Sequence, residues 1–181
     1  MLKRTKIVDL LNAQEPQNQV LLKGWVRTRR DAKDFSFLEI NDGSCLKNIQ
    51  IIANNTLDNY DEVKKISTGS SVSISGSLVE SQGGNQKFEV IASHVEIYSI
   101  APDDFPLQKK KHTDEYLRTI AHLRPRSNKY GAAFRIRSEL SYAIHKFFHE
   151  RRFRYVHTPI ITGSDCEGAG EMFQITTLDM K

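Results

Sequence analysis

The stretch that decides the fold spans residues 24–48 and reads GWVRTRRDAKDFSFLEINDGSCLKN. In an extended strand, successive side chains point to opposite faces. If Leu38 and Ile40 face a core, Phe35 and Phe37 therefore stand on the outer face. Three arginines precede this strand, namely Arg27, Arg29 and Arg30. Exposed aromatic rings beside arginines favour stacking of nucleic-acid bases over a charged backbone. The alternative is a shifted register in which both Phe side chains belong to the core.

The first hundred residues predict five strands, with a helix between the third and the fourth. The expected strands cover residues 20–30, 35–40, 47–53, 71–80 and 86–98, and the expected helix covers 57–66. Gly43 supplies the positive φ of a hairpin turn, whereas Gly24 and Gly76 lie inside strands and indicate bends. This order is typical of a β-barrel, the five-stranded OB-fold that binds oligonucleotides. A five-stranded sheet without a ligand is the alternative. A short helix capped by Thr5 is expected before the first strand.

Charge is distributed unevenly along the chain. Residues 1–100 carry equal numbers of basic and acidic side chains, whereas residues 109–154 carry 13 Lys/Arg against 4 Asp/Glu. This excess indicates a polyanionic partner, the alternative being a solvated basic linker and helix. The two cysteines, Cys45 and Cys166, form no C-x-x-C pattern, which favours a reducing, cytoplasmic location. No stretch approaches the length of an apolar membrane span, and no signal peptide is recognisable.

The second half of the chain changes from strand patterning to helical patterning. Residues 101–126 predict a linker, since two prolines at its start, within 101–106, exclude regular pairing, and residues 127–152 predict a long helix with one apolar side. A strand carrying Pro159 is expected at 153–161, near an edge or interface. The glycine-rich loop at 163–173 gathers carboxylates that could bind an ammonium group or a cation, or form a solvated turn. We expect no metal site, because the histidines of the helix have no carboxylate placed as in H-E-x-x-H.

Four segments of the chain resemble the asparaginyl-tRNA synthetases. They are GWVRTRRD, FSFLEINDGSCLKNIQ, QKKKHTDEYLRTIAHLRPR and YVHTPIITGSDCEGAGEMF. These enzymes belong to the class II aminoacyl-tRNA synthetases, in a subgroup with the aspartyl and lysyl enzymes. The resemblance covers essentially the whole chain in order, and the CEGAGE run is similar to the asparaginyl version in particular.

The resemblance implies roles for individual residues. Phe37 would stack on the middle anticodon base, Gln50 would hydrogen-bond the edge of that uridine, and Glu89 would contact a neighbouring base. Arg30 matches an anticodon-contacting arginine of the family. Strict alternation places Arg30 on the side of Val26, however, so this role requires the strand to bend or end near residue 28.

The resemblance also implies a domain plan. Residues 1–100 would form an OB-fold anticodon-binding domain, 101–126 a linker or hinge, and 127–181 the truncated start of an α+β class II catalytic domain. Pro159 would belong to the dimer-forming motif 1, and Glu167 would help to hold the ammonium group of the amino-acid substrate. The complete enzyme would use ATP and Mg²⁺ to attach asparagine to its tRNA.

Motifs 2 and 3 of the class would lie beyond residue 181, so the 181-residue chain alone is expected to be inactive. Two other interpretations stay open: an aspartyl-type synthetase, and a freestanding OB-fold module that binds RNA without catalysis.

Overall fold

The structure is a computed structural model that describes residues 2–84, 86–163 and 175–177. The chain divides into two compact units, Met1–Ser138 and Glu139–Lys181, and each is described by itself. No helix among the described residues is both long enough and apolar enough to cross a membrane.

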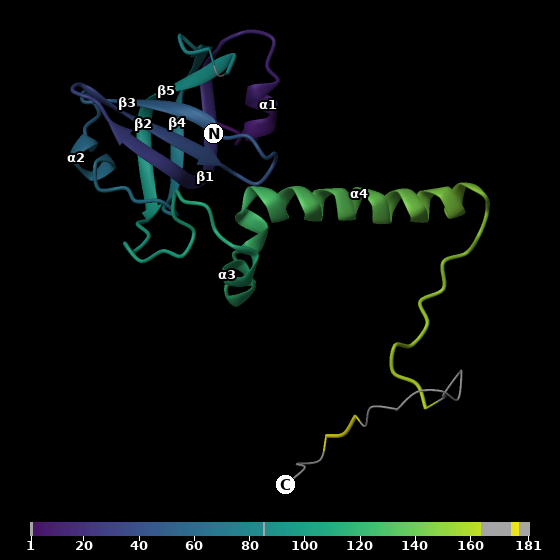
Figure 1. The fold of residues 1–181 in the computed structure, drawn as a ribbon. Helices are drawn as coiled ribbons and strands as arrows, with labels where there is room; N and C mark the ends of the chain where they lie inside the picture. The colour runs from purple at the N-terminus through teal and green to yellow at the C-terminus, as the bar shows by residue number, and fades with distance from the viewer. Residues whose placement is uncertain (1, 85, 164–174, 178–181) are drawn as a thin grey trace. The chain divides into compact units, whose positions relative to one another are not determined.

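A closed five-stranded barrel forms most of the first unit (Figure 1). Its strands are β1 (Gln17–Asp31), β2 (Phe35–Asn41), β3 (Ile49–Asn54), β4 (Ser71–Glu80) and β5 (Phe88–Ser99). They close in the order β1-β2-β3-β5-β4, in which β3 and β5 are parallel and the other pairs are antiparallel. Helix α2 (Tyr60–Val63) lies between β3 and β4 in sequence and is shorter than predicted. The predicted OB-fold barrel is therefore confirmed.

The barrel interior is filled by the aliphatic side chains that alternation predicted. In β2 and β3 the burial pattern alternates strictly, with Leu38, Ile40, Ile49 and Ile51 fully buried. Phe37 lies on the opposite, outer side of the sheet and is half-buried. The register is thus the one that exposes an aromatic ring, and the alternative of a shifted register is wrong.

The strand pairings contain several register shifts, two of which lie close to the expected bends and the candidate site. The pairing of β1 with β2 shifts register between Val26 and Thr28, and the pairing of β4 with β5 shifts between Ser75 and Gly76. A β-bulge inserts one residue on one strand, so side chains beyond it change face. The bend expected at Gly76 coincides with the second shift.

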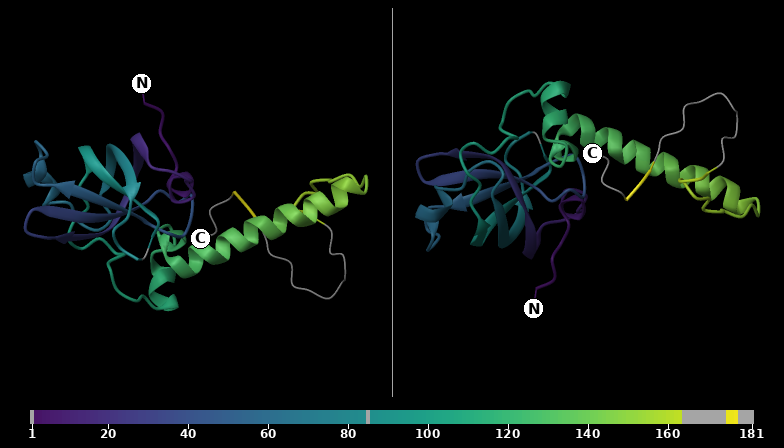
Figure 2. Two further views of the ribbon diagram at one scale, coloured as in Figure 1. Left: turned by 90° about the horizontal axis from the view of Figure 1, so that it is seen from above. Right: turned by 90° about the horizontal axis from the view of Figure 1, so that it is seen from below.

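Helix α1 (Ile7–Leu11) packs on the barrel, to which it contributes the buried Ile7 and Leu10 (Figure 2). Its predicted cap is wrong, because the N-cap residue is Lys6 and makes no side-chain hydrogen bond. The turn after β2 supplies the cap instead. The backbone amide of Ile7 donates to Asp42 Oδ2 at 3.1 Å, and the next amide, that of Val8, donates to the Ser44 hydroxyl at 3.0 Å. A contact between residues 35 positions apart cannot be recognised from a local capping pattern.

Asp42→Ala is expected to lower the free energy of unfolding by about 1–2 kcal/mol, the usual cost of losing a helix cap. Burial alone would raise the pKa of Asp42. Hydrogen bonds from the Ser44 hydroxyl and amide and from the Ile7 amide, together with the charge of Arg4, outweigh burial and lower this pKa. A lowered folded-state pKa means that the carboxylate stabilises the fold above its unfolded pKa of about 3.9, and that this stability is lost as pH falls through the folded value.

Urea denaturation at pH 7 and at pH 3 measures this effect. The difference between the parent chain and Asp42→Ala should shrink at the lower pH, whereas the exposed control Asp58→Ala should change stability little at either pH. Equal stability of the parent and Asp42→Ala at pH 7 would contradict the capping role.

The segment that follows the barrel contains more regular structure than a linker. It forms α3 (Asp114–Thr119), the 3-10 helix η1 (Arg124–Arg126) and the start of α4 (Asn128–Glu150). The sequence analysis missed α3, whose N-cap Thr113 accepts a hydrogen bond from the Tyr116 amide. Leu107 and Leu117 are buried in this segment. The expected linker or hinge at residues 101–126 therefore contains short helices and two buried leucines.

The second unit contains the rest of α4 and an irregular segment. The strand predicted at residues 153–161 is wrong, because no regular structure is assigned there. A β-strand requires a hydrogen-bonded neighbour, and no described residue pairs with this segment. The apolar side of α4 is exposed, as in Ile144 and Phe147, and so is Pro159. Glu167 and most of the predicted substrate loop lie outside the described residues.

Candidate nucleic-acid interface

The outer face of β1, β2, β3 and β5 carries aromatic, amide and charged side chains side by side. Phe37 of β2 pairs with Arg30 of β1 on one side and with Ile52 of β3 on the other. One pleat further along, Glu39 of β2 pairs with Gln50 of β3. We call this surface the outer face.

The bulge in β1 decides which arginine reaches the outer face. Without it, Arg30 would share the inward direction of Val26. The register shift between Val26 and Thr28 instead places Arg30 opposite Phe37, with its guanidinium carbon 4.8 Å from the centre of the ring. Phe35 contacts the same ring edge-on, with 4.9 Å between the two ring centres. A ring flanked by a guanidinium can stack a base while the cation meets the backbone.

The three arginines of β1, Arg27, Arg29 and Arg30, make different contacts. Arg29 donates to the backbone carbonyls of Lys64 and Ile66 and forms a salt bridge with Asp31, so it anchors the connection after α2. Arg27 donates to the carbonyl of Arg126 at 2.9 Å. The sequence suggested one arginine cluster, but of the three arginines only Arg30 stands beside Phe37.

A hydrogen-bonded carboxylate orients the amide of Gln50. Gln50 Nε2 donates to Glu89 Oε2 at 2.8 Å, and the Ser81 hydroxyl donates to the same oxygen at 3.2 Å. Glu89 is only 4% exposed. Because the amide nitrogen is engaged by Glu89, the carbonyl oxygen of Gln50 remains available as an acceptor. On the other side of Gln50, Asn48 Nδ2 donates to Glu39 Oε2 at 3.2 Å.

The structure thus brings together the four anticodon-binding candidates that the sequence analysis named, Arg30, Phe37, Gln50 and Glu89. Pro159 lies in the other unit. The sequence analysis did not name two further side chains of this hydrogen-bonded group, Glu39 and Ser81. The alternation that placed Phe37 outward also points to Glu39, whereas Ser81 reaches Glu89 only because the β4–β5 hairpin folds back.

An open groove of about 830 Å³ adjoins this face. Its lining includes Glu39, Asn48 and Gln50, together with Lys47 and Lys87 from the neighbouring turns. The groove therefore contains both polar groups that can form hydrogen bonds with base edges and cations that can bind phosphates. The described residues include no group of three His, Cys, Asp or Glu side chains that could hold a metal ion.

Comparisons with known proteins agree with this geometry. The family model of the OB-fold nucleic acid binding domain matches residues 20–98. The family model of the class II tRNA synthetases (D, K and N) matches residues 113–180. The fold resembles the crystal structure of asparaginyl-tRNA synthetase from Pyrococcus horikoshii, with a TM-score of 0.77 and 22% identity, over 90% of this chain and 39% of that one. The chain therefore combines a segment similar to the OB-fold nucleic acid binding domain with a segment similar to the class II tRNA synthetases (D, K and N).

Over almost its whole length the chain is similar to the asparagine–tRNA ligases. It is 64% identical over 178 residues to the asparagine–tRNA ligase of Oleidesulfovibrio alaskensis, covering 98% of this chain and 39% of the relative. It is 56% identical over 177 residues to that of Geotalea uraniireducens, covering 98% of this chain and 38% of the relative. The chain thus spans about two fifths of the length of these relatives.

Proposed function

We propose that this chain is the anticodon-recognising part of an asparagine–tRNA ligase, and that the whole enzyme joins asparagine to its tRNA at the expense of ATP. The observation that carries the proposal is the outer face, where Arg30, Phe37, Gln50 and Glu89 converge from four different strands. The similarity to asparagine–tRNA ligases, at 64% identity in one case, supports the choice of amino acid.

The experiment that tests this proposal is an RNA titration. The chain should bind a stem-loop carrying an asparagine anticodon more tightly than stem-loops of the same length that carry unrelated anticodons. Equal binding of all these stem-loops would contradict anticodon recognition. It would indicate a barrel that binds RNA without sequence selectivity.

In the proposed complex, each of the four side chains has one task. Phe37 stacks on the middle anticodon base, and Arg30 adds a cation beside that stack. The carbonyl oxygen of Gln50 accepts the N3–H of the middle uridine. Both recorded hydrogen bonds of Glu89 involve Oε2, which leaves Oε1 for a neighbouring base.

Gln50→Ala is expected to reduce the preference for uridine over cytidine at the middle anticodon position by about three- to tenfold, the range of one neutral hydrogen bond. Affinity for RNA in general should fall less, because stacking on Phe37 tolerates any base. Titrations with stem-loops that differ at this one base measure the effect, and Gln17→Ala is a matched control because Gln17 is exposed at the start of β1. If both stem-loops lost affinity equally, Gln50 would only position the RNA.

The remaining elements fit the same enzyme. We propose that the exposed apolar side of α4 and the segment around Pro159 form the interface of a homodimer. Ile136 is 69% exposed and Ile160 is 91% exposed, which favours burial against a partner copy. Glu167 is proposed to hold the ammonium group of asparagine, and ATP and Mg²⁺ are proposed to act in the whole enzyme. A cytoplasmic location is proposed as well, and it agrees with the free thiol of Cys45.

A further inference from the structure

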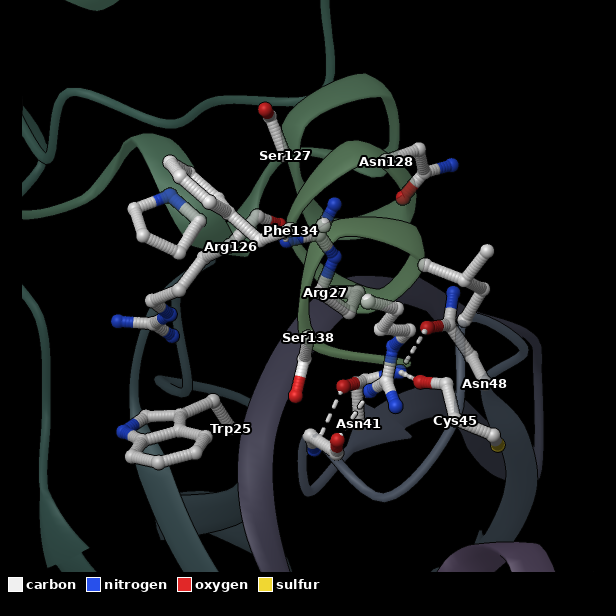
Figure 3. A pocket seen from close by; sticks show the side chains of 15 residues that line it. Trp25, Arg27, Asn41, Cys45, Asn48, Arg126, Ser127, Asn128, Phe134 and Ser138 are labelled. Atoms are coloured by element: carbon white, nitrogen blue, oxygen red, sulfur yellow. Dashed lines mark hydrogen bonds between the residues drawn. The ribbon is translucent and has the colours of Figure 1, made fainter. Parts of the chain in front are cut away.

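A second cavity, of about 400 Å³, lies in the first unit where the barrel meets η1 and the first turns of α4 (Figure 3). Strand β1 contributes Trp25 and Arg27, η1 contributes Arg126, and α4 contributes Phe134 and Arg135. We call it the arginine pocket. None of the anticodon-binding candidates lines it.

The guanidinium of Arg126 lies over the ring of Trp25, with 4.7 Å between its central carbon and the ring centre (Figure 3). Phe105 approaches the same guanidinium at 5.6 Å. These rings hold the cation in place without using its N–H groups. No described residue accepts a hydrogen bond from the Arg126 side chain, so a planar array of donors is available to a ligand.

Within the described part of the chain, the positive charge of the arginine pocket is not balanced by neighbouring carboxylates. Burial lowers the pKa of Arg126, and the neighbouring Arg27 lowers it further by repulsion. Burial also lowers the pKa of Arg27, with Glu39 opposing the effect through its charge. Among the described residues, no carboxylate lies within salt-bridge distance of Arg27, Arg126 or Arg135. An anion between these guanidiniums would relieve their repulsion.

The arginine pocket continues into the groove beside Gln50. Four residues line both cavities, namely Cys45, Leu46, Asn48 and Arg135. The side chain of Arg135 is held at this junction by donating to the backbone carbonyls of Gly43 and Ser44. An RNA strand whose bases lie on the outer face could therefore run through the groove, pass Arg135 and reach Arg126.

We propose that the arginine pocket binds a backbone phosphate of the same tRNA whose anticodon lies on the outer face. This inference rests on the proposed function and adds to it a site that reads no base. Phosphate is the favoured anion because arginine binds it through paired N–H groups, which Arg126 offers freely. The pocket would therefore increase the affinity for the tRNA and fix the position of its backbone, whereas the outer face would select the anticodon sequence.

The test uses full-length tRNA with an asparagine anticodon and the variants Arg126→Gln and Arg126→Lys. Losing one phosphate contact should reduce the slope of log K against log salt by about 0.7–0.9. We expect Arg126→Gln to show this reduction and about tenfold weaker binding at low salt. Arg126→Lys keeps the charge and should retain most of the slope. The exposed control Lys65→Gln should keep the slope of the parent chain.

A second measurement needs no variant. Trp25 is the single tryptophan of the chain and lies against Arg126. Its fluorescence should therefore change in step with tRNA binding. A change that saturates with inorganic phosphate at constant ionic strength, but not with tRNA, would assign the pocket to a free anion and overturn the proposal.

The two proposals fail in different ways. If the parent chain bound all tRNAs equally, the proposed function would fail, whatever Arg126 did. If Phe37→Ala weakened binding while Arg126→Gln, folded as judged by its thermal midpoint, kept the salt slope of the parent chain, the arginine pocket would be a structural clamp. The further inference alone would then be overturned.

Discussion

Phe37→Ala is expected to weaken binding of an RNA stem-loop with an asparagine anticodon by on the order of 5–100-fold. Base–aromatic stacking is worth roughly 1–3 kcal/mol per base, which sets this range. Phe37 is half-buried on the outer face and does not belong to the barrel core, so its removal should leave the fold intact. It also leaves Arg30 without the ring over which its guanidinium lies.

Titration of the stem-loop by the parent chain and by Phe37→Ala measures the loss. Phe37→Tyr keeps a ring and should stay close to the parent, whereas Phe37→Leu keeps apolar volume without a ring and should lose most of the affinity. Tyr98→Ala serves as a control, since Tyr98 is an exposed aromatic at the far end of β5. Unchanged affinity for a folded Phe37→Ala would remove Phe37 from the RNA-binding surface.

The direction of Phe37, Gln50 and Glu89 could be predicted from the sequence because strands have a period of two. Once Leu38 and Ile40 were assigned to the core, the outward direction of Phe37 and Glu39 followed. The same rule placed Gln50 and Glu89 outward on strands that pair through the barrel closure. Local periodicity was sufficient for Phe37 and Gln50, since β2 and β3 alternate strictly between buried and partly exposed residues. In β5 the alternation is not visible in the burial, because Glu89 is itself buried between Phe88 and Val90.

The position of Arg30 could not be predicted in this way. One inserted residue in β1 changes the face of all side chains beyond it, and no residue type marks the insertion between Val26 and Thr28. The separation of Arg27 from Arg30 depends on the same shift. It also depends on a carbonyl of Arg126, 99 positions away, which only the folded chain brings into contact.

Gly76→Ala is expected to lower the free energy of unfolding by about 3 kcal/mol, the upper part of the range for inserting a methyl group into a packed interior. A Cβ at Gly76 would lie 2.1 Å from the backbone oxygen of Ile91 and 3.0 Å from the Cα of Ala92. Both atoms belong to the backbone of β5, so relief requires the ladder between β4 and β5 to move. On its other edge β4 pairs with β1, where Gly76 lies opposite Val20, and this second pairing leaves β4 little freedom to shift.

Urea denaturation followed by the fluorescence of Trp25 reports on the barrel directly, because Trp25 lies in β1. The matched control is Gly84→Ala, since a Cβ at Gly84 would meet nothing within 4 Å and the residue is exposed in the β4–β5 turn. This control should change stability by less than about 0.5 kcal/mol. A loss below about 1 kcal/mol for Gly76→Ala would show that β4 and β5 can separate at this point, so the bulge would not need glycine. A loss near the expected value makes the glycine a requirement of barrel closure, and with it of the parallel β3–β5 pairing that sets Glu89 beside Gln50.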